Sequence, residues 1–186
     1  MPEMIERNMK QPIRFLVSGP GLIGKKHCAL VHGTADCVLA CIVAPNTQKN
    51  RSIANSFETK LFTSIDQALY SCEAQPAKKI DAIIISSPNA FHFDQAITCI
   101  NHNIPVLIEK PITDTLARAR DLSVRASQAK SLVLVGHHRT HSTLISSADG
   151  FLRSNRFGRL VSVVGSAQFY KPEEYLSLMK SGGNVG

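Results

Sequence analysis

The sequence predicts an α/β protein in which a doubly wound parallel sheet is followed by the start of an incomplete α+β domain. Three observations lead to this prediction. Short apolar runs rich in Val, Ile and Leu show little polar alternation, which is typical of strands buried on both faces. Longer segments of helical period separate these runs and indicate strand–helix–strand units with right-handed crossovers. The alternation ends near residue 135, where a polar, histidine-rich cluster begins.

The expected elements follow in chain order. Five apolar runs are predicted strands, with Leu61–Thr63 as one more short strand: Ile13–Val17, Val38–Val43, Ala82–Ile85, Val106–Ile108 and Leu132–Val135. The segments between them are predicted helices: Leu22–His32, Thr47–Phe57, Ser64–Ser71, Ala90–Asn101 and Thr113–Ala129. We expect N-caps at Thr47, Ser64, Asn89 and Thr113. Further on, we expect helices over Leu144–Ser154 and 171–180, and a long strand over Leu160–Phe169. The domains are predicted as 1–136 and 137–186.

Composition limits the class of protein. The 186 residues are 44% hydrophobic and 19% charged, which predicts a packed core. The net charge of +7 comes from scattered Lys and Arg, so a solvated basic surface is favoured over nucleic-acid binding. The five cysteines are odd in number and form no CxxC, which favours free, buried thiols in a reducing compartment. The first residues lack an apolar signal segment, and no run approaches the ~18 apolar residues of a membrane helix. We therefore expect a cytoplasmic protein.

A glycine-rich loop follows the first predicted strand. Gly19, Gly21 and Gly24 match G-x-G-x-x-G, and a predicted helix opens directly behind them. In this motif the first glycine permits a tight turn, the second lets the backbone approach a pyrophosphate, and the third permits close helix–strand packing. The helix N-terminus adds free N–H groups for the phosphates. An ordinary glycine turn is the alternative, but the order of strand, loop and helix favours a bound dinucleotide in a Rossmann-type domain.

The end of the second predicted strand lacks an expected acid. A carboxylate that grips the ribose hydroxyls usually stands about 20 residues after the glycine loop, and this chain has Ala44 there. A 2′-phosphate would meet no repulsion, Lys49 or Arg51 could pair with it, and Asn46 or Thr47 could donate hydrogen bonds. The pattern predicts NADP tolerance or preference over NAD. The alternative is that Lys49 and Arg51 only solvate the next helix.

Two further strand ends carry polar residues. The sequence SSPNAFH follows Ala82–Ile85, and EKP follows Val106–Ile108. Ligands bind at such carboxyl ends in open parallel sheets. Lys110 is therefore a candidate proton donor or hydrogen-bond donor to a substrate oxygen, and Glu109 could orient it or contact the cofactor. A surface ion pair in a loop is the alternative.

These residues carry a resemblance to the glucose-fructose oxidoreductase / inositol dehydrogenase / MocA (Gfo/Idh/MocA) family of NAD(P)-dependent oxidoreductases. The matching segments are GPGLIGKKH, SPNAFH, VLIEKPITDT and VGHHRTHS, and FGRLVSVVGSAQFYKP resembles the opening of the second domain of that family. The resemblance implies a Rossmann domain followed by a substrate domain with a large open sheet, which commonly forms a homo-oligomer interface. It implies NAD or NADP as cofactor and oxidation of a secondary hydroxyl of a sugar or polyol, or the reverse reduction.

The resemblance also implies site residues. Gly19, Gly21, Leu22, Ile23 and Gly24 would hold the pyrophosphate; Ser87, Pro88, Asn89 and His92 would line the path to the nicotinamide; and Glu109 and Lys110 would sit beside it, with Lys110 in the catalytic set. His138 and Arg139 would lie near the active-site entrance. A metal site at His137, His138 and His141 is not expected, because the Glu of HExxH is absent. His27, His32 and His102 are interpreted as helix-surface or helix-end residues without a special role.

The remaining catalytic residues of the family, usually an Asp and a His on a second-domain helix, lie downstream of residue 186. We therefore expect this 186-residue chain to bind cofactor without normal turnover. The alternative function, from a different class, is a catalytically silent dinucleotide-binding module, such as a redox sensor or a truncated remnant. Lys110 favours catalysis, and the missing second half favours the silent module.

Overall fold

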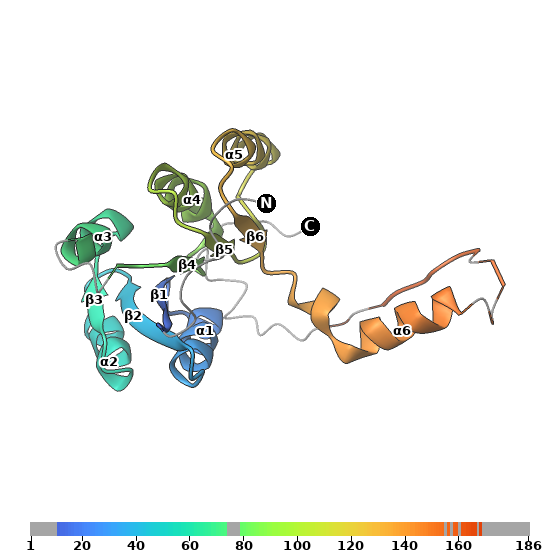
Figure 1. Cartoon of the computed structure of the whole chain (residues 1–186), viewed down its shortest axis with the longest axis horizontal. Coiled ribbons are helices and arrows are strands. Elements are labelled where there is room, and N and C mark those ends of the chain that lie inside the picture. Colours follow the sequence, from blue (N-terminus) through green and yellow to red (C-terminus); the bar gives the residue numbers. More distant parts are fainter. Residues whose placement is uncertain are drawn as a thin grey trace.

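A six-stranded parallel sheet forms the centre of the molecule (Figure 1). The computed structural model describes residues 11–73, 79–154, 156, 158–159, 161–166 and 168. In chain order the strands are β1 (Ile13–Ser18), β2 (Cys37–Val43), β3 (Lys60–Phe62), β4 (Ala82–Ile85), β5 (Val106–Ile108) and β6 (Val133–Val135). Their order across the sheet is β3-β2-β1-β4-β5-β6, and every neighbouring pair is parallel. This confirms the predicted doubly wound parallel sheet.

Helices cover both faces of the sheet. They are α1 (Leu22–His32), α2 (Gln48–Ser56), α3 (Ile65–Glu73), α4 (His92–Asn101) and α5 (Leu116–Gln128). Figure 1 shows α1 and α2 on one face and α3, α4 and α5 on the other. The chain builds β1, β2 and β3 outward in one direction and then returns to place β4 on the other side of β1. The topological switch point, where ligands bind in such sheets, therefore lies between β1 and β4.

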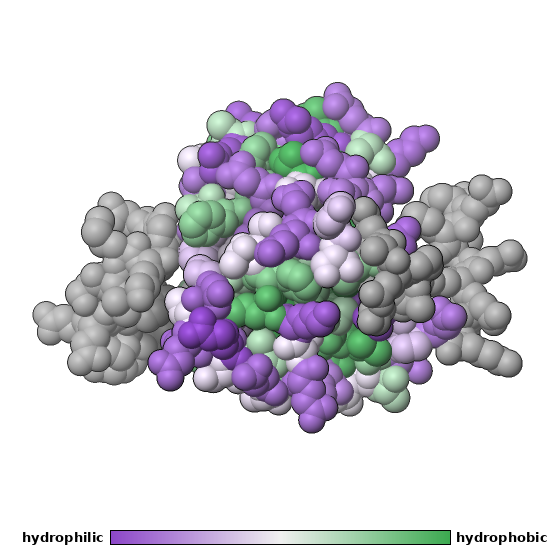
Figure 2. Space-filling model, turned by 90° about the vertical axis from the view of Figure 1, so that its left-hand side faces the viewer, coloured by the Kyte–Doolittle hydropathy of each residue, from purple (hydrophilic) through white to green (hydrophobic). Residues whose placement is uncertain are grey.

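The core follows from the period-2 alternation of the strands. Leu16, Ile83 and Ile85 pack into a cluster with α3, α4 and α5, whereas the intervening Val17 and Ile84 pack into a second cluster with α1 and α2. Both faces of each central strand are thus apolar, which is why these strands read as continuous hydrophobic runs. Figure 2, which views the molecule from the side of β3, shows apolar residues between two mostly polar layers.

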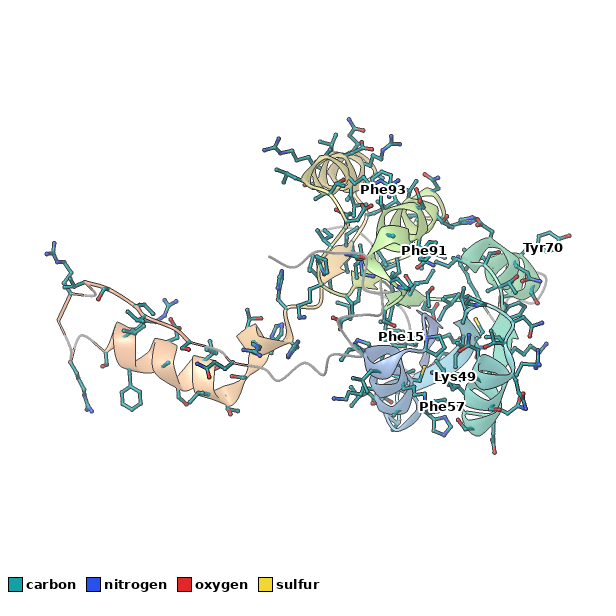
Figure 3. All side chains as sticks on the ribbon, turned by 180° about the vertical axis from the view of Figure 1, so that it is seen from behind. Phe15, Lys49, Phe57, Tyr70, Phe91 and Phe93 are labelled. Atoms are coloured by element: carbon teal, nitrogen blue, oxygen red, sulfur yellow. The ribbon has the colours of Figure 1, made fainter. Side chains whose placement is uncertain are left out.

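Aromatic and capping contacts fix the helices. The Arg118 guanidinium of α5 lies 5.4 Å from the centre of the Phe93 ring of α4. Phe93 is labelled in Figure 3. Two predicted N-caps are confirmed: Thr47 Oγ1 accepts from the Asn50 N–H (3.2 Å), and Ser64 Oγ accepts from the Gln67 N–H (3.1 Å).

The other two predicted caps are wrong. Helix α5 starts later than expected and is capped by Thr115, whose Oγ1 accepts from the Arg118 N–H; the side chain of Thr113 is buried and donates to the Thr115 carbonyl instead. Asn89 opens a short 3₁₀ turn, Asn89–Phe91, and α4 begins after it without a side-chain cap. In both places an additional turn or bend separates the strand from the helix, so the helix begins later than predicted.

The chain beyond β6 forms a 3₁₀ turn, η4 (His138–His141), and then α6 (Thr143–Arg153), close to the predicted helix. Figure 1 shows α6 apart from the sheet, and none of its side chains is buried. The strand predicted over Leu160–Phe169 is wrong for 161–166 and 168, which have no strand structure. A β-rich segment needs a neighbouring strand for its N–H and C=O groups, and no described strand pairs with it. The helix predicted over 171–180 lies outside the described residues.

None of the helices that the structure describes is both long and apolar enough to cross a membrane.

The cysteines divide into two classes. Burial raises the pKa of the Cys28 thiol to about 11 and those of Cys41 and Cys99 to about 12, and all three side chains are buried. Cys37 and Cys72 are partly exposed, and all five thiols are free.

Because the thiolate is the reactive form of cysteine, we expect iodoacetamide at about pH 8, near the ordinary thiol pKa of about 8.5, to modify only the partly exposed pair in the native protein. Mass spectrometry of labelled peptides measures this, and urea-unfolded protein, labelled at all five positions, is the control. Rapid native labelling of any of the three buried thiols would contradict the packing described.

Candidate cofactor-binding site

The polar segments found in the sequence meet at the carboxyl edge of the sheet. Backbone hydrogen bonds continue the ladders one residue past the strands: Gly19 N–H to Val43 O (2.9 Å), Ser86 N–H to Ser18 O (2.8 Å), Glu109 N–H to Ile85 O (2.8 Å) and Gly136 N–H to Ile108 O (2.8 Å). The glycine loop, SSPN and EKP therefore lie beside one another although they are far apart in the chain. They flank the β1/β4 switch point, which is the place expected for a ligand.

Gly19 and Gly24 allow loop, helix and strand end to pack at backbone distance. Gly19 has a φ of +83°, and a Cβ there would lie 2.4 Å from the Ser87 Cα. A Cβ on Gly24 would lie 2.0 Å from the Gly19 carbonyl oxygen and 2.7 Å from Ser86 Oγ. Real Cβ atoms do not approach other atoms so closely, so both positions require glycine. The predicted roles of the first and third glycines in turning and packing thus have a structural basis.

Gly21 differs from both, because a Cβ on it would meet no atom within 4 Å. It is the N-cap residue of α1 with a φ of −70°, no side chain caps this helix, and its first turn contains no acidic residue. The next two side chains, Leu22 and Ile23, are 81% and 42% exposed. The start of α1 therefore presents bare backbone to open space, a feature that suits a pyrophosphate group.

Serine and glutamine side chains join the two loops at the switch point. Ser86 Oγ lies 2.9 Å from both the Ser18 and Gly19 carbonyl oxygens. The hydroxyls of Ser87 and Ser18 both donate to Gln95 Oε1, at 2.8 and 3.1 Å. Sequence reasoning missed Gln95. The signal was its place on α4 one turn after His92, the face that turns toward the strand ends.

His92 is buried, with a relative exposure of 2%. Its Nδ1 lies 2.9 Å from the Pro111 carbonyl oxygen and its Nε2 lies 2.7 Å from the Ser87 carbonyl oxygen. Both ring nitrogens are thus directed at the backbone of the two loops rather than at open space. The nearby Asn89 Oδ1 is buried and has no hydrogen-bond partner among the described residues. A ribose or amide group of a ligand could supply that partner.

Glu109 occupies the end of β5 and pairs with His27 of α1. His27 Nε2 lies 2.9 Å from Glu109 Oε1, and the two side chains are 19% and 15% exposed. The Lys110 N–H donates to Glu109 Oε2 at 3.3 Å, while Lys110 itself is exposed. A Cβ on Gly136 would lie 3.1 Å from the Glu109 carboxylate. The interpretation of His27 as a helix-surface residue is wrong, because its side chain is mostly buried against Glu109; its place one turn after Gly24 on α1 was the available signal.

The end of β2 carries no carboxylate. Ala44 is buried, and its N–H donates to the Phe62 carbonyl oxygen at 2.9 Å. Arg51 Nη1 donates to Asn46 Oδ1 at 2.7 Å, which places its guanidinium against the loop after β2. Thr47 Oγ1 serves as the cap of α2, and Lys49 on that helix is exposed (Figure 3).

After β6, His137 directly precedes the exposed turn η4, which contains His138 and His141. The Thr140 hydroxyl donates to the His137 carbonyl oxygen at 2.7 Å, and His138 and Arg139 are exposed. In the part of the chain that the structure describes, no three His, Cys, Asp or Glu side chains are placed to hold a metal ion.

The parallel strand order and the glycine loop at the β1/β4 switch point are those of a Rossmann-type α/β protein. The sequence model of a family described as "Oxidoreductase family, NAD-binding Rossmann fold" (GFO_IDH_MocA) matches residues 13–137. The chain belongs to this family, and the resemblance inferred from its motifs is confirmed.

Individual relatives agree with this assignment. The chain is 30% identical over 129 residues to the uncharacterized oxidoreductase YgjR of Escherichia coli K12, covering 69% of this chain and 37% of that protein. It is 24% identical over 160 residues to inositol 2-dehydrogenase of Corynebacterium glutamicum strain R, covering 84% of this chain and 46% of that protein. The crystal structure of myo-inositol 2-dehydrogenase from Lactobacillus plantarum matches with a TM-score of 0.72 at 19% identity, over 81% of this chain and 44% of that one. The chain thus spans less than half the length of these relatives.

Proposed function

We propose that this chain provides the cofactor-binding half of an NAD(P)-dependent oxidoreductase that moves hydride between the nicotinamide and a secondary alcohol of a sugar or polyol. One observation carries the proposal. The uncovered start of α1 at Gly21 and the exposed Lys110 follow the carboxyl ends of β1 and β5, which lie on the same edge of the sheet with only β4 between them. A diphosphate group and a reacting group bound together need such a pair of positions.

The residues fit the cofactor in the following way. The N–H groups at the start of α1 would bind the pyrophosphate, with Gly19 and Gly24 fixing the loop and Leu22 and Ile23 flanking it. Ser87, Pro88 and Asn89 would line the path to the nicotinamide. The buried, unpaired Oδ1 of Asn89 supports this assignment, because a bound ligand would satisfy it.

The proposed chemistry divides between cofactor and chain. When bound, the nicotinamide supplies the hydride acceptor or donor. In the oxidation Lys110 would accept the proton of the substrate hydroxyl, and in the reverse reduction it would donate a proton to the substrate carbonyl oxygen. Glu109 would orient the Lys110 backbone, whose N–H donates to its carboxylate. Holding the reacting groups in a fixed orientation lowers the entropic part of the activation free energy.

The substrate class and the second domain are part of the proposal. Inositol 2-dehydrogenases among the relatives support a sugar or polyol substrate. The family model ends at residue 137, which supports a boundary between a cofactor domain, 1–136, and the start of a substrate domain, 137–186. His138 and Arg139 would then stand at the entrance to the active site, and the second domain would carry the oligomer interface.

Cofactor choice is proposed to extend to NADP. Ala44 leaves the ribose position without a negative charge, and the hydrogen bond from Arg51 to Asn46 keeps a guanidinium beside the loop after β2. A 2′-phosphate near that loop would gain a charged partner.

A fluorescence titration tests binding and cofactor choice together. We expect NADH and NADPH both to bind the chain, and Arg51→Ala to weaken NADPH binding about tenfold, the size of one charge-assisted hydrogen bond, while NADH affinity stays nearly constant. Arg125→Ala is the matched control, because Arg125 pairs with Asp121 on α5, away from this loop. No binding of either nucleotide would overturn the proposed function, whereas clearly tighter NADH binding would overturn only the extension to NADP.

A further inference from the structure

We propose that His27 and His92 hold Lys110 in its working position from two sides and are positioning residues of the site. The inference rests on the proposed function. Lys110 lies between two residues that are each bound by one of these histidines. His27 contacts the side chain of Glu109, and His92 contacts the backbone of Pro111.

The contact from His27 fixes the Glu109 carboxylate. One carboxylate oxygen lies 2.9 Å from His27 Nε2, and the other accepts the Lys110 N–H at 3.3 Å. Gly136 closes the remaining side, since even a methyl group there would stand 3.1 Å from the carboxylate. Both partners are mostly buried, so these contacts hold the carboxylate in place, and the carboxylate in turn holds the backbone of Lys110.

The contact from His92 fixes the other end of the segment. The ring lies between the Ser87 and Pro111 carbonyl oxygens, at 2.7 and 2.9 Å, and is excluded from solvent. Carbonyl oxygens only accept hydrogen bonds, so a ring nitrogen that carries a proton donates to the carbonyl it faces. The loop after β4 and the loop after β5 are thereby joined through one side chain.

Both histidines come from elements that carry the proposed cofactor contacts. His27 lies one turn after Gly24 on α1, the helix whose start would bind the pyrophosphate. His92 opens α4 directly behind Ser87, Pro88 and Asn89. The same two elements that would hold the cofactor thus set the position of Lys110 relative to it.

The test compares NADH with ADP-ribose, which has the pyrophosphate but lacks the nicotinamide. We expect His27→Leu to weaken NADH binding about tenfold, as for one lost hydrogen bond to a charged group, and to change ADP-ribose binding less than about twofold. His27→Gln, which keeps a donor, is expected to restore most of the NADH affinity. His32→Leu, on the last turn of the same helix, is the matched control and is expected to affect neither ligand.

A double-mutant cycle shows whether the histidine acts through the lysine. In a Lys110→Met background, His27→Leu is expected to add little further loss of NADH affinity. His92→Gln is tested in the same cycle, with His92→Leu as a second variant and circular dichroism to confirm folding. Equal loss of both ligands, or an undiminished histidine effect without Lys110, would overturn the inference. If the unaltered chain bound neither ligand, the proposed function would fail instead.

Discussion

A Gly24→Ala substitution is expected to lower the free energy of unfolding by about 3 kcal/mol, the upper part of the usual range for overpacking. The added Cβ would stand 2.0 Å from the Gly19 carbonyl oxygen, which is backbone and cannot rotate away. Relief would require α1 to move from the glycine loop and from Ser86, and with it the buried contacts of Cys28 and Val31. Urea denaturation followed by circular dichroism measures the change.

Gly21→Ala is the matched variant with the opposite expectation. A Cβ at this position meets no atom within 4 Å, and its φ of −70° suits any residue. We expect a loss of stability below about 1 kcal/mol, the size of a poorer N-cap, but at least about tenfold weaker NADH binding, because the methyl group would occupy the space of the pyrophosphate. Equal denaturation midpoints for Gly24→Ala and the unaltered chain would contradict the packing. Unchanged NADH affinity in Gly21→Ala would contradict the location of the site.

The second large effect concerns Lys110. In an enzyme that carries these residues with a complete substrate domain, Lys110→Met is expected to reduce kcat by about 10²- to 10⁴-fold, the contribution of a positioned acid or base. Methionine keeps the length and apolar stem of the side chain but removes its donor, so NADH should still bind, although about tenfold more weakly. The measurement is NADH formation over a panel of polyols, with Lys60→Met, an exposed lysine at the start of β3, as control. A kcat within twofold of the unaltered enzyme would remove Lys110 from the proposed mechanism.

A labelling experiment examines the same lysine without turnover. Bound NADH should protect Lys110 from acetylation by an amine-reactive reagent, because the nicotinamide would lie against it, whereas Lys60 should react equally with and without nucleotide. Peptide mass spectrometry distinguishes the two sites. Equal modification of Lys110 in both conditions would place the nicotinamide elsewhere.

Local sequence patterns predicted much of this fold and part of the site. α1, β4 and β5 have the predicted bounds, because each is delimited by glycine, proline or polar residues. The glycine loop was recognisable because its three glycines must stand at fixed intervals. Helix starts were less certain, since Thr113 and Thr115 offer the same cap chemistry and only the turn after Pro111 selects between them.

Local sequence patterns did not predict the contacts between residues that are distant in the chain. His27 and Glu109 are 82 residues apart, and Ser18 and Gln95 are 77 apart, so neither pair leaves a periodic or spaced signal. At 161–166 the local sequence pattern predicted a strand that the structure does not contain. Its valines have high strand propensity, but propensity does not form a strand without a neighbouring one.

The close approach of Gly19 and Gly24 to Ser86 and Ser87 has a thermodynamic consequence. β1, β2 and β3 with their helices form one half of the sheet and β4, β5 and β6 the other, and these contacts join the two halves. A dinucleotide that binds across these contacts would stabilise both halves of the sheet together. Saturating nucleotide should therefore raise the melting temperature of the entire sheet in a single cooperative transition.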